Sequence, residues 1–430
     1  MYYVYSPKIY CNFSSIPLLL VAMFSIKDSA TRRKILASSG AVLGGSLAGC
    51  LSGGDSGSGT GDGDTGGGTT GTGGDGSTSD GSCSGETYEV GYGDSQTTVC
   101  SDAFPTDEKL YVYAVQSGWM NWPEVMQAFK EQYGVQLNDD DRSSGEALQD
   151  ARSHAQNPTH SAFNGGYTYA IQAMRDGLTQ AYKPANWDKV PDQLKTDDGH
   201  MTATRRMTTA VTYRKDVYEE RGLEEPTTWA DLLQPEIMQD LALQTPQAAV
   251  GLAAALSINN AYGGSLDDVQ PVIDYLSDVQ EKGATFRGNL EGDFTSGNIG
   301  TFVEYDYTGL DLKYNSDAIG EEQVGVSLLT GPDGEQGAFQ NPYGYGMLDD
   351  APNPDAAKLF MDYALSLEGQ RQFLDAYVRP IRASELEMPE EFPAQSRYEE
   401  TQFGVDYGAL VENQQSIIND IGSGVGMTGY

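Results

Sequence analysis

The amino-acid sequence predicts an α/β fold that follows a long disordered tether. Patterns typical of β-strands and of amphipathic α-helices alternate from Lys109 onwards, which favours mostly parallel sheets covered by helices on both faces. Hydrophobic residues make up 39% of the 430 residues and aromatic residues 10%, enough to close the core of two or three folding units. Residues 52–82, by contrast, contain only Gly, Ser, Thr and Asp. This segment has no large apolar side chain with which to form a hydrophobic core.

The charge of the chain narrows the classes of function. It carries 62 acidic and 26 basic residues, a formal net charge of -36. This charge excludes a role in coating nucleic acid, because phosphates are bound by Lys and Arg. A highly acidic surface stays hydrated in concentrated salt, where its self-repulsion is screened. The composition therefore predicts a halophilic source.

Residues 1–50 have the order of a secretory signal, with basic residues followed by an apolar run and small residues. The segment Thr31–Leu36 resembles a twin-arginine export signal, and Leu47–Cys50 resembles a lipoprotein processing box. Together they predict cleavage before Cys50 and lipidation of that cysteine. Met23 is an alternative start, since it lies just ahead of the arginines. A membrane-spanning anchor is the competing interpretation, but the apolar run is shorter than the ~20 residues that a spanning helix needs.

Residues 51–82 are predicted to be the disordered tether, with a reach of roughly 30 Å. Lipid and tether would hold the folded part at the cell surface, on the outer face of the cytoplasmic membrane. Residues 83–106 contain Cys83 and Cys100. In an exported protein such a pair predicts a disulfide, which would stabilise the fold by ~3 kcal/mol in the chain-entropy model. A metal site is the alternative, but no histidine lies in this segment.

The elements of the folded region follow in order. Leu110–Val115 has the apolar content of a short strand, and Val125–Tyr133 carries the apolar stripe of a helix. Ser143 and Glu146 form a capping box, with Ser143 as the N-cap of the next helix. Residues 164–166, Asn-Gly-Gly, open another helix.

The alternation continues to the last third of the chain. Ser265 followed by Asp268 starts a long helix, and strands are expected at Ile299–Val303 and Val324–Leu328. Asn353-Pro354 is typical of an N-cap and a first helical residue. No internal repeat is recognisable.

Five segments occur in the order typical of one known family: Asp141–Leu148, Gly177–Pro184, Tyr213–Asp216, Pro226–Leu233 and Asn353–Gln370. On these segments, roughly residues 107–385 resemble the extracellular solute-binding proteins of ABC importers, family 1, which have the type II periplasmic-binding-protein fold. The resemblance is to the branch of ferric-iron, phosphonate and polyamine binders. With the signal and the charge, it suggests a haloarchaeal lipoprotein.

The resemblance implies two α/β lobes that close about a hinge on a ligand in the cleft between them. Lobe 1 is expected to comprise residues 107–203 and 322–380, and lobe 2 residues 204–321 and 381–430. Hinge crossings are expected near residues 200–212 and 318–326. The implied partners are a small-molecule or ion ligand and the membrane subunits of an ABC permease. The binding protein itself is expected to be a monomer without a cofactor.

Two helix starts are candidate seats for an anion, because backbone N–H groups there lack partners and carry partial positive charge. One is formed by Ser143, Ser144 and Gly145. The other is formed by Gly165, Gly166 and Tyr167, after Asn164. A plain helix cap and a plain glycine turn are the respective alternatives.

Glu304, Tyr305, Asp306 and Tyr307 follow a predicted strand, and their two carboxylates and two phenols are candidate hard oxygen ligands for a cation. Ferric binders of the family carry adjacent tyrosines near here. The resemblance assigns Tyr305 to one of them, whereas Asp306 stands where the second is expected. Tyr305 and Asp306 are therefore the candidate metal ligands. A solvated acidic surface is the alternative.

Three further residues are candidate ligand contacts. Tyr343 and Tyr345 lie in a glycine-rich segment where the backbone could approach a ligand. Arg379 lies beside a rigid proline, where a guanidinium could grip a carboxylate or phosphate. The alternatives are that the tyrosine rings simply pack in the core and that Arg379 pairs with a surface acid. Arg205 and Arg206, on a predicted lobe crossing, could likewise contact a ligand or pair with a surface acid. The histidines, His154, His160 and His200, lack ligand spacing.

The predicted function is therefore membrane-tethered capture of ferric iron or a phosphorylated or phosphonate small molecule for an ABC importer. A polyamine or another organic cation is the alternative within this class. An enzyme is not expected, because the folded region has no H-E-x-x-H, G-x-S-x-G, P-loop or dinucleotide fingerprint. A tethered glycosidase-like hydrolase and a structural surface module are the alternatives from other classes.

Overall fold

The computed structural model describes residues 83–105, 110–115 and 120–427. The predicted export signal, the lipidation of Cys50 and the tether lie outside the described residues. All described residues belong to a single compact unit. Within them, no helix has both the length and the apolar character that crossing a bilayer requires.

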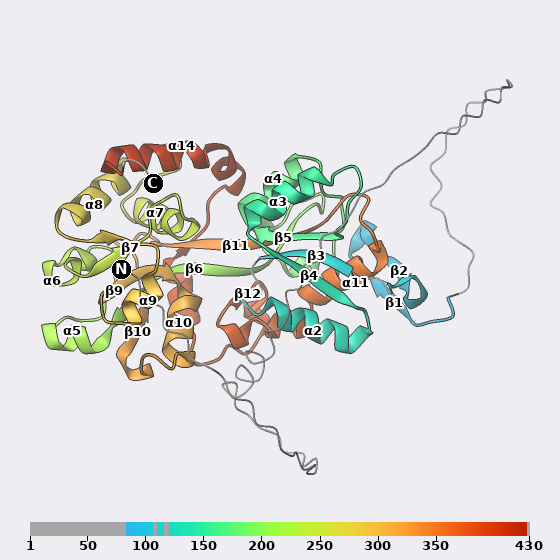
Figure 1. Cartoon of the computed structure of the whole chain (residues 1–430), viewed down its shortest axis with the longest axis horizontal. Helices are drawn as coiled ribbons and strands as arrows, with labels where there is room; N and C mark the ends of the chain where they lie inside the picture. The colour runs from blue at the N-terminus through green and yellow to red at the C-terminus, as the bar shows by residue number, and fades with distance from the viewer. Residues whose placement is uncertain (1–82, 106–109, 116–119, 428–430) are drawn as a thin grey trace, which may run out of the picture. The chain divides into compact units, whose positions relative to one another are not determined.

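The first group of elements is a parallel sheet with connecting helices (Figure 1). Its strands are β3 (Leu110–Val115), β4 (Leu137–Arg142) and β5 (Ala162–Gly166), and its helices are α2 (Trp122–Tyr133), α3 (Ser144–Ser153) and α4 (Tyr167–Arg175). Helix α2 buries the predicted stripe, including Val125 and Phe129, and it packs beside β4. It ends at Gly134, whose φ of 70° is the left-handed conformation that glycine adopts at little cost. We call strands β3, β4 and β5 the first half-sheet.

The second group repeats this arrangement. Its parallel strands are β7 (Leu241–Leu243), β8 (Thr285–Phe286) and β9 (Thr301–Tyr305). Its helices are α5 (Lys215–Arg221), α6 (Pro235–Met238), α7 (Ala249–Ala261), α8 (Gln270–Glu281), α9 (Leu290–Thr295) and α10 (Asp306–Asn315). Helix α7 consists mainly of apolar residues, and it is buried because it packs against β9, α8 and the central part of the sheet. We call strands β7, β8 and β9 the second half-sheet.

Two long antiparallel strands join the half-sheets, β6 (Thr202–Arg214) and β11 (Ala338–Met347). The start of β6 pairs with β11, and its end pairs with β9 and with β10 (Val324–Ser327). The strand order is therefore β4-β3-β5-β11-β6-β9-β7-β8. Figure 1 shows β6 and β11 running between the two groups.

These strands correct two expectations. The sheet is mixed rather than mostly parallel, because β6 and β11 run antiparallel to their neighbours. The crossing expected near residues 200–212 is confirmed by β6, whereas the crossing expected near residues 318–326 is wrong. The second crossing strand is β11, and β10 pairs only with the end of β6. The exact lobe boundaries stay a prediction.

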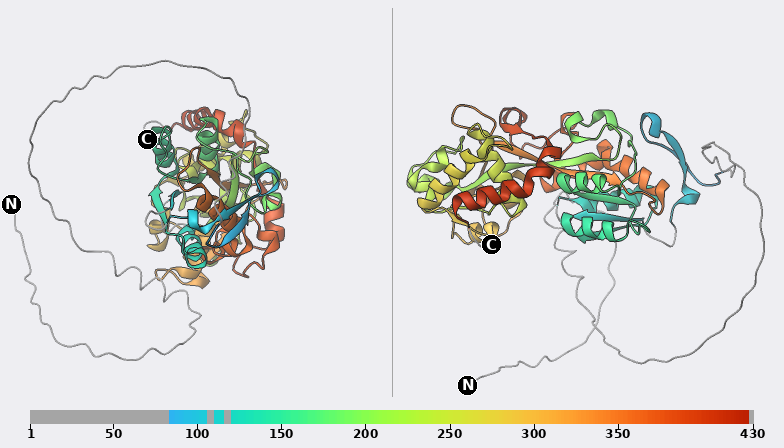
Figure 2. Two further views of the ribbon diagram at one scale, coloured as in Figure 1. Left: turned by 90° about the vertical axis from the view of Figure 1, so that its right-hand side faces the viewer. Right: turned by 90° about the horizontal axis from the view of Figure 1, so that it is seen from above.

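The last third of the chain covers both groups. It contains α11 (Pro354–Leu365), α12 (Leu367–Arg371), β12 (Arg379–Pro380), α13 (Gln395–Thr401), β13 (Gln402–Phe403) and α14 (Tyr407–Val425). The predicted Asn353-Pro354 start of α11 is confirmed. Helix α14 packs on α4 of the first group and on α8 of the second (Figure 2).

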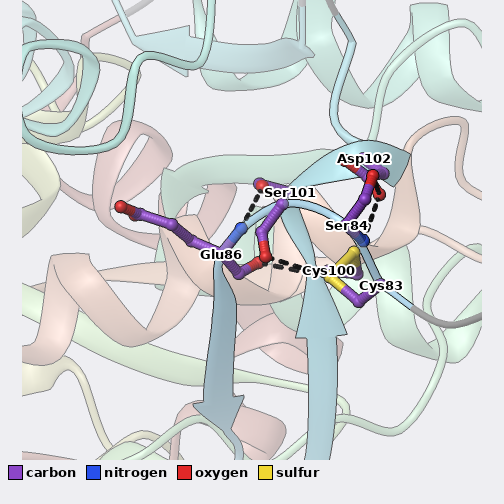
Figure 3. Close-up of a disulfide and its surroundings, with 7 residues drawn as sticks. Cys83, Ser84, Glu86, Cys100, Ser101 and Asp102 are labelled. Carbon is purple, nitrogen blue, oxygen red and sulfur yellow. Dashed lines mark hydrogen bonds between the residues drawn. A yellow bond between two sulfur atoms is a disulfide. The ribbon is translucent and has the colours of Figure 1, made fainter.

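The predicted disulfide between Cys83 and Cys100 is confirmed (Figure 3). It closes the antiparallel hairpin of β1 (Thr87–Val90) and β2 (Thr97–Cys100). Beside it, both the backbone N–H and the hydroxyl of Ser84 donate to Asp102 at 2.8 Å. The hairpin is also fastened to α11, since the N–H of Gly91 donates to Asp362 at 2.9 Å.

Candidate functional site

A cavity of about 110 Å³ lies between the two groups of elements. One wall is formed by the starts of α3 and α4, the other by α7 and α14, and β11 contributes the floor. Its polar lining includes Ser144, Thr168, Tyr169, Gln247, Asn341 and Gln414. None of the described lining residues carries a charge, although the chain has 62 acidic residues.

The capping box separates the roles of Ser143 and Ser144. The hydroxyl of Ser143 accepts from the N–H of Glu146 at 3.3 Å, and the N–H of Ser143 donates to the Glu146 carboxylate at 3.0 Å. These bonds hold the pKa of Glu146 below its usual value. Ser143 thus caps α3, which leaves Ser144, the first residue of α3, to face the cavity.

The starts of α3 and α4 are bonded to each other. The Ser144 hydroxyl accepts a hydrogen bond of 3.0 Å from the N–H of Gly166. Gly166 is the N-cap of α4 and offers no side chain to cap its first turn. The N–H groups of that turn are therefore open donors at the cavity wall.

The other predicted residues of the two anion seats support this wall or turn away from it. A Cβ atom on Gly165 would lie 3.0 Å from the Phe163 ring and 3.2 Å from the Ser144 hydroxyl, so the close approach of β5 to α3 needs glycine. Gly145 lies beside the Tyr169 ring. Tyr167 points away from the lining and packs edge-on against Tyr407, with ring centroids 5.2 Å apart.

A tyrosine of β9 connects the floor to the far wall. Asn341 Nδ2 donates to the Tyr305 hydroxyl at 2.7 Å, and that hydroxyl donates to the carbonyl of Ala249 at 3.4 Å. Burial raises the pKa of Tyr305 well above its usual value. The phenol is therefore a neutral link between β9, β11 and α7.

Arg205 lies behind the floor. The sequence left it open between a ligand contact and a surface ion pair. Its guanidinium is fully buried and lies 4.8 Å from the ring centroid of Tyr343, a lining residue, and 4.9 Å from that of Trp122. It donates to the Asn164 side chain at 3.0 Å, whereas its Nε atom has no partner among the described residues. Burial lowers its pKa to about 10, so it stays charged at neutral pH.

Sequence alternation alone predicts that Arg205 and Arg206 face opposite sides of β6. The alternation does not show which of the two sides of β6 faces the cavity. The pairing of Arg205 with Tyr343 across β6 and β11 supplies that information.

The predicted cation ligands do not present free oxygen atoms at one place. Asp306 Oδ1 accepts from the N–H groups of Thr208 and Tyr307, at 2.9 and 3.1 Å, and its Oδ2 accepts from the Tyr398 hydroxyl at 2.7 Å. Burial raises the pKa of Asp306. Glu304 is buried at the end of β9, and burial raises its pKa to about 8.

Tyr345 and Arg379 lie outside the cavity lining. The Tyr345 ring packs against Trp122 and Phe360, with centroid distances of 5.7 and 6.0 Å. The Arg379 guanidinium lies 4.0 Å from the centroid of the Tyr398 ring and donates to Gln395. Of the predicted ligand residues, the structure thus brings Ser144, Gly166 and Tyr343 to the cavity, with Tyr305 bonded to its floor.

Comparison with known proteins gives three kinds of match. A family model for bacterial extracellular solute-binding proteins matches residues 124–397. A curated relative from Haemophilus influenzae, described only as an uncharacterized protein, is 26% identical over 260 residues, which are 56% of this chain and 69% of that protein.

Several solved structures share the fold. The periplasmic binding protein AfuA from Actinobacillus pleuropneumoniae, with exogenous fructose-6-phosphate bound, is 17% identical with a TM-score of 0.60, covering 75% of this chain and 100% of that one. The ferric binding protein from Campylobacter jejuni is 20% identical with a TM-score of 0.58, covering 74% and 99%. Iron-bound HitA from Pseudomonas aeruginosa is 15% identical with a TM-score of 0.59, covering 73% and 99%. The predicted two-lobed fold is confirmed by these neighbours.

Proposed function

The chain belongs to the family of bacterial extracellular solute-binding proteins, and from that premise we propose that it captures a small organic phosphate or phosphonate for an ABC permease. Family and fold are those of binding proteins of ABC importers, which are exported. The identity of the ligand, and the anchoring of the protein by a lipid on Cys50, are parts of the proposal.

The observation that supports this choice of ligand is the positive electrostatic character of the cavity wall. An uncapped helix start and the Ser144 hydroxyl form one wall, and no acidic side chain is among the described lining residues. Arg205 adds a buried positive charge behind Tyr343. Backbone N–H groups and a fixed cation stabilise an anion and repel a cation. This favours a phosphate group at the polar wall.

The opposite wall supports an organic ligand rather than inorganic phosphate. Leu252 and Leu256 of α7 and Ile418 of α14 line it. Burying a carbon skeleton against these side chains would add ~25 cal/mol per Å² of apolar area. Helix α7 belongs to the second group of elements, so a ligand would contact both groups. Contacts with both sides favour the closed state of a two-lobed binder.

Ferric iron is a weaker candidate in this conformation. It needs several anionic oxygen ligands, and the Tyr305 hydroxyl and both Asp306 oxygens already have protein partners. The proposal also keeps two lobes, which are expected to move about β6 and β11, with the second crossing at β11 rather than near residue 322.

The proposal is tested by native mass spectrometry of the purified protein and by calorimetric titration with fructose 6-phosphate, methylphosphonate, ferric citrate and spermidine. We expect saturable binding of a phosphate-bearing probe without turnover. Gly166→Ala should weaken that binding at least tenfold, because its methyl group would enter the cavity. The fold should tolerate it, since the nearest atoms would be 3.6 and 3.7 Å away. Tight binding of ferric ion or spermidine alone, or conversion of a bound probe, would overturn the proposal.

A further inference from the structure

A second cluster of ligating groups lies in the first group of elements, on residues that do not line the cavity described above. Asp140 comes from β4, Asp150 from α3, and His160 from the segment just before β5. One carboxylate oxygen from each aspartate and one ring nitrogen of His160 all lie within 4.8 Å of one another. Their spacing in the sequence gives no hint of this, because the β-α-β connection brings them together.

The imidazole of His160 is held with one nitrogen facing the carboxylates. His160 is only 7% exposed. The ring stacks on Tyr113, with centroids 3.8 Å apart and an interplanar angle of 12°, and Nδ1 lies 2.9 Å from the Thr159 hydroxyl. The other nitrogen, Nε2, lies 3.3 Å from Asp140 Oδ2 but makes no hydrogen bond with any described residue. A buried nitrogen that makes no hydrogen bond therefore faces the carboxylate pair.

The two aspartates are fixed by their own partners. Asp150 accepts from the Tyr113 hydroxyl at 2.7 Å and from Arg142 Nη1 at 3.0 Å. Asp140 accepts from Arg142 Nε at 2.7 Å. Arg142 is the internal counter-ion of the pair in this conformation. Its side chain is 36% exposed, so its guanidinium can move into solvent when another cation neutralises the carboxylates.

We propose that Asp140, Asp150 and His160 bind a divalent transition-metal ion of the zinc or manganese type. One imidazole and two carboxylates are a donor set that suits these ions. A tetrahedral ion with ligand distances of ~2.1 Å holds its ligands ~3.4 Å apart, close to the 3.3 Å between His160 Nε2 and Asp140 Oδ2. A cavity of about 30 Å³, lined by Tyr113, His154 and His160, adjoins the ring and has room for a bound water.

The ion would brace the elements that carry the polar wall of the ligand cavity. β4 ends at Arg142, immediately before the cap of α3, and β5 ends at Gly166. A metal bound to β4, α3 and the segment before β5 would hold these three elements together at a point away from the ligand. The site is independent of the proposed ligand, because none of its three residues lines that cavity.

The experiment uses the folded protein stripped of metal with a chelator and then titrated with Zn²⁺ and Mn²⁺ in concentrated KCl, which screens weak binding by the acidic surface. We expect one saturable site and a rise in the melting temperature. His160→Gln should weaken binding at least tenfold. His200→Gln is the matched control, because His200 Nδ1 likewise lies 3.0 Å from a threonine hydroxyl but His200 is not part of the cluster; it should bind like the wild type.

Two further variants decide the matter if His160→Gln fails to fold. Asp140→Asn should also weaken binding at least tenfold, since it removes the negative charge of one ligand, on a side chain that is 26% exposed. Arg142→Gln should tighten binding, because it removes the cation that competes for both carboxylates. Absence of a saturable site in the wild type, or equal affinity in wild type and Asp140→Asn, would overturn the proposal and leave an ordinary ion-pair network.

Discussion

The hydroxyl of Ser144 accepts a hydrogen bond of 3.0 Å from the backbone N–H of Gly166, which joins the starts of α3 and α4. The two helix starts therefore keep a fixed separation, and both contribute to the polar wall of the cavity. The neighbouring Ser143 is engaged only in the capping box of α3. Two adjacent serines with different roles allow stability and binding to be measured separately.

Ser144→Ala should weaken the affinity for a phosphate-bearing probe at least tenfold, because it removes a hydroxyl from the cavity wall and releases the N–H of Gly166. Ser143→Ala should leave the affinity within about twofold. Each change should lower the free energy of unfolding by ~1 kcal/mol, through a lost hydrogen bond in one case and a lost cap in the other. Calorimetry and urea unfolding measure the two quantities. Equal losses of affinity would show that Ser144 has no special contact with the ligand.

Replacing Cys83 and Cys100 together by alanine should lower the free energy of unfolding by up to ~3 kcal/mol. The hairpin that the disulfide closes is bonded to the rest of the fold, by Gly91 to Asp362 of α11 and by the N–H of Tyr92 to the carbonyl of Lys183. Loss of the disulfide should therefore be felt in the global urea transition. Reduced wild-type protein is the control and should match the double variant. An unchanged urea midpoint would mean that the hairpin unfolds separately.

Tyr305→Phe distinguishes the cation and anion hypotheses. If Tyr305 ligates ferric iron, the variant should lose at least tenfold in iron affinity, about 1.4 kcal/mol. The geometry instead predicts a cost in stability of ~1 kcal/mol, because Asn341 loses its hydrogen-bond acceptor. Affinity for a phosphate-bearing probe should change less than tenfold.

Tyr307→Phe is the control, since the Tyr307 ring stacks on Tyr305 at a centroid distance of 6.2 Å without a bond to Asn341. Titration with ferric citrate, followed by visible absorption, gives the readout. A tyrosinate-iron band that disappears only in Tyr305→Phe would contradict the anion proposal.

Local patterns in the sequence predicted the elements well. The apolar stripe of α2 and the capping box of Ser143 and Glu146 depend on residues within one or two helical turns, and both were confirmed. The second crossing strand was misplaced, because strand order depends on pairing between distant segments. The pairing of Tyr343 with Arg205 is such a case, and no periodicity within either strand specifies it.

The candidate site could be predicted only in part, for a related reason. Residue type suggested that Asp306 and Tyr305 offer oxygen ligands, but Asp306 accepts from the Tyr398 hydroxyl and from the N–H of Thr208, both far away in the sequence. Burial by distant elements also sets the protonation state of these side chains, and this burial cannot be read from the sequence composition. His160 was likewise judged by its spacing along the chain, whereas the fold brings its Nε2 atom to 3.3 Å from Asp140 Oδ2.

Glu304 should make the stability of the protein fall as pH rises through the neutral range. Burial raises its pKa from 4.5 to about 8 in the folded state. Below pH 4.5 the carboxyl is protonated in both states and contributes no pH dependence. Between the two pKa values the unfolded chain releases the proton and the folded protein keeps it, so the free energy of unfolding decreases with pH. Above the folded pKa both states are ionised and the effect is constant.

Glu304→Gln removes this titration and keeps an oxygen that can accept from the N–H of Tyr305. The variant should therefore be more stable than wild type by ~3 kcal/mol at about pH 7 and by less than ~1 kcal/mol at about pH 5. Urea unfolding at both pH values measures the difference, with the exposed residue Glu399 changed to Gln as the control. Equal stability of wild type and variant at both pH values would contradict the prediction. It would mean that water reaches the Glu304 carboxyl, and that the second half-sheet is more open than its buried strands imply.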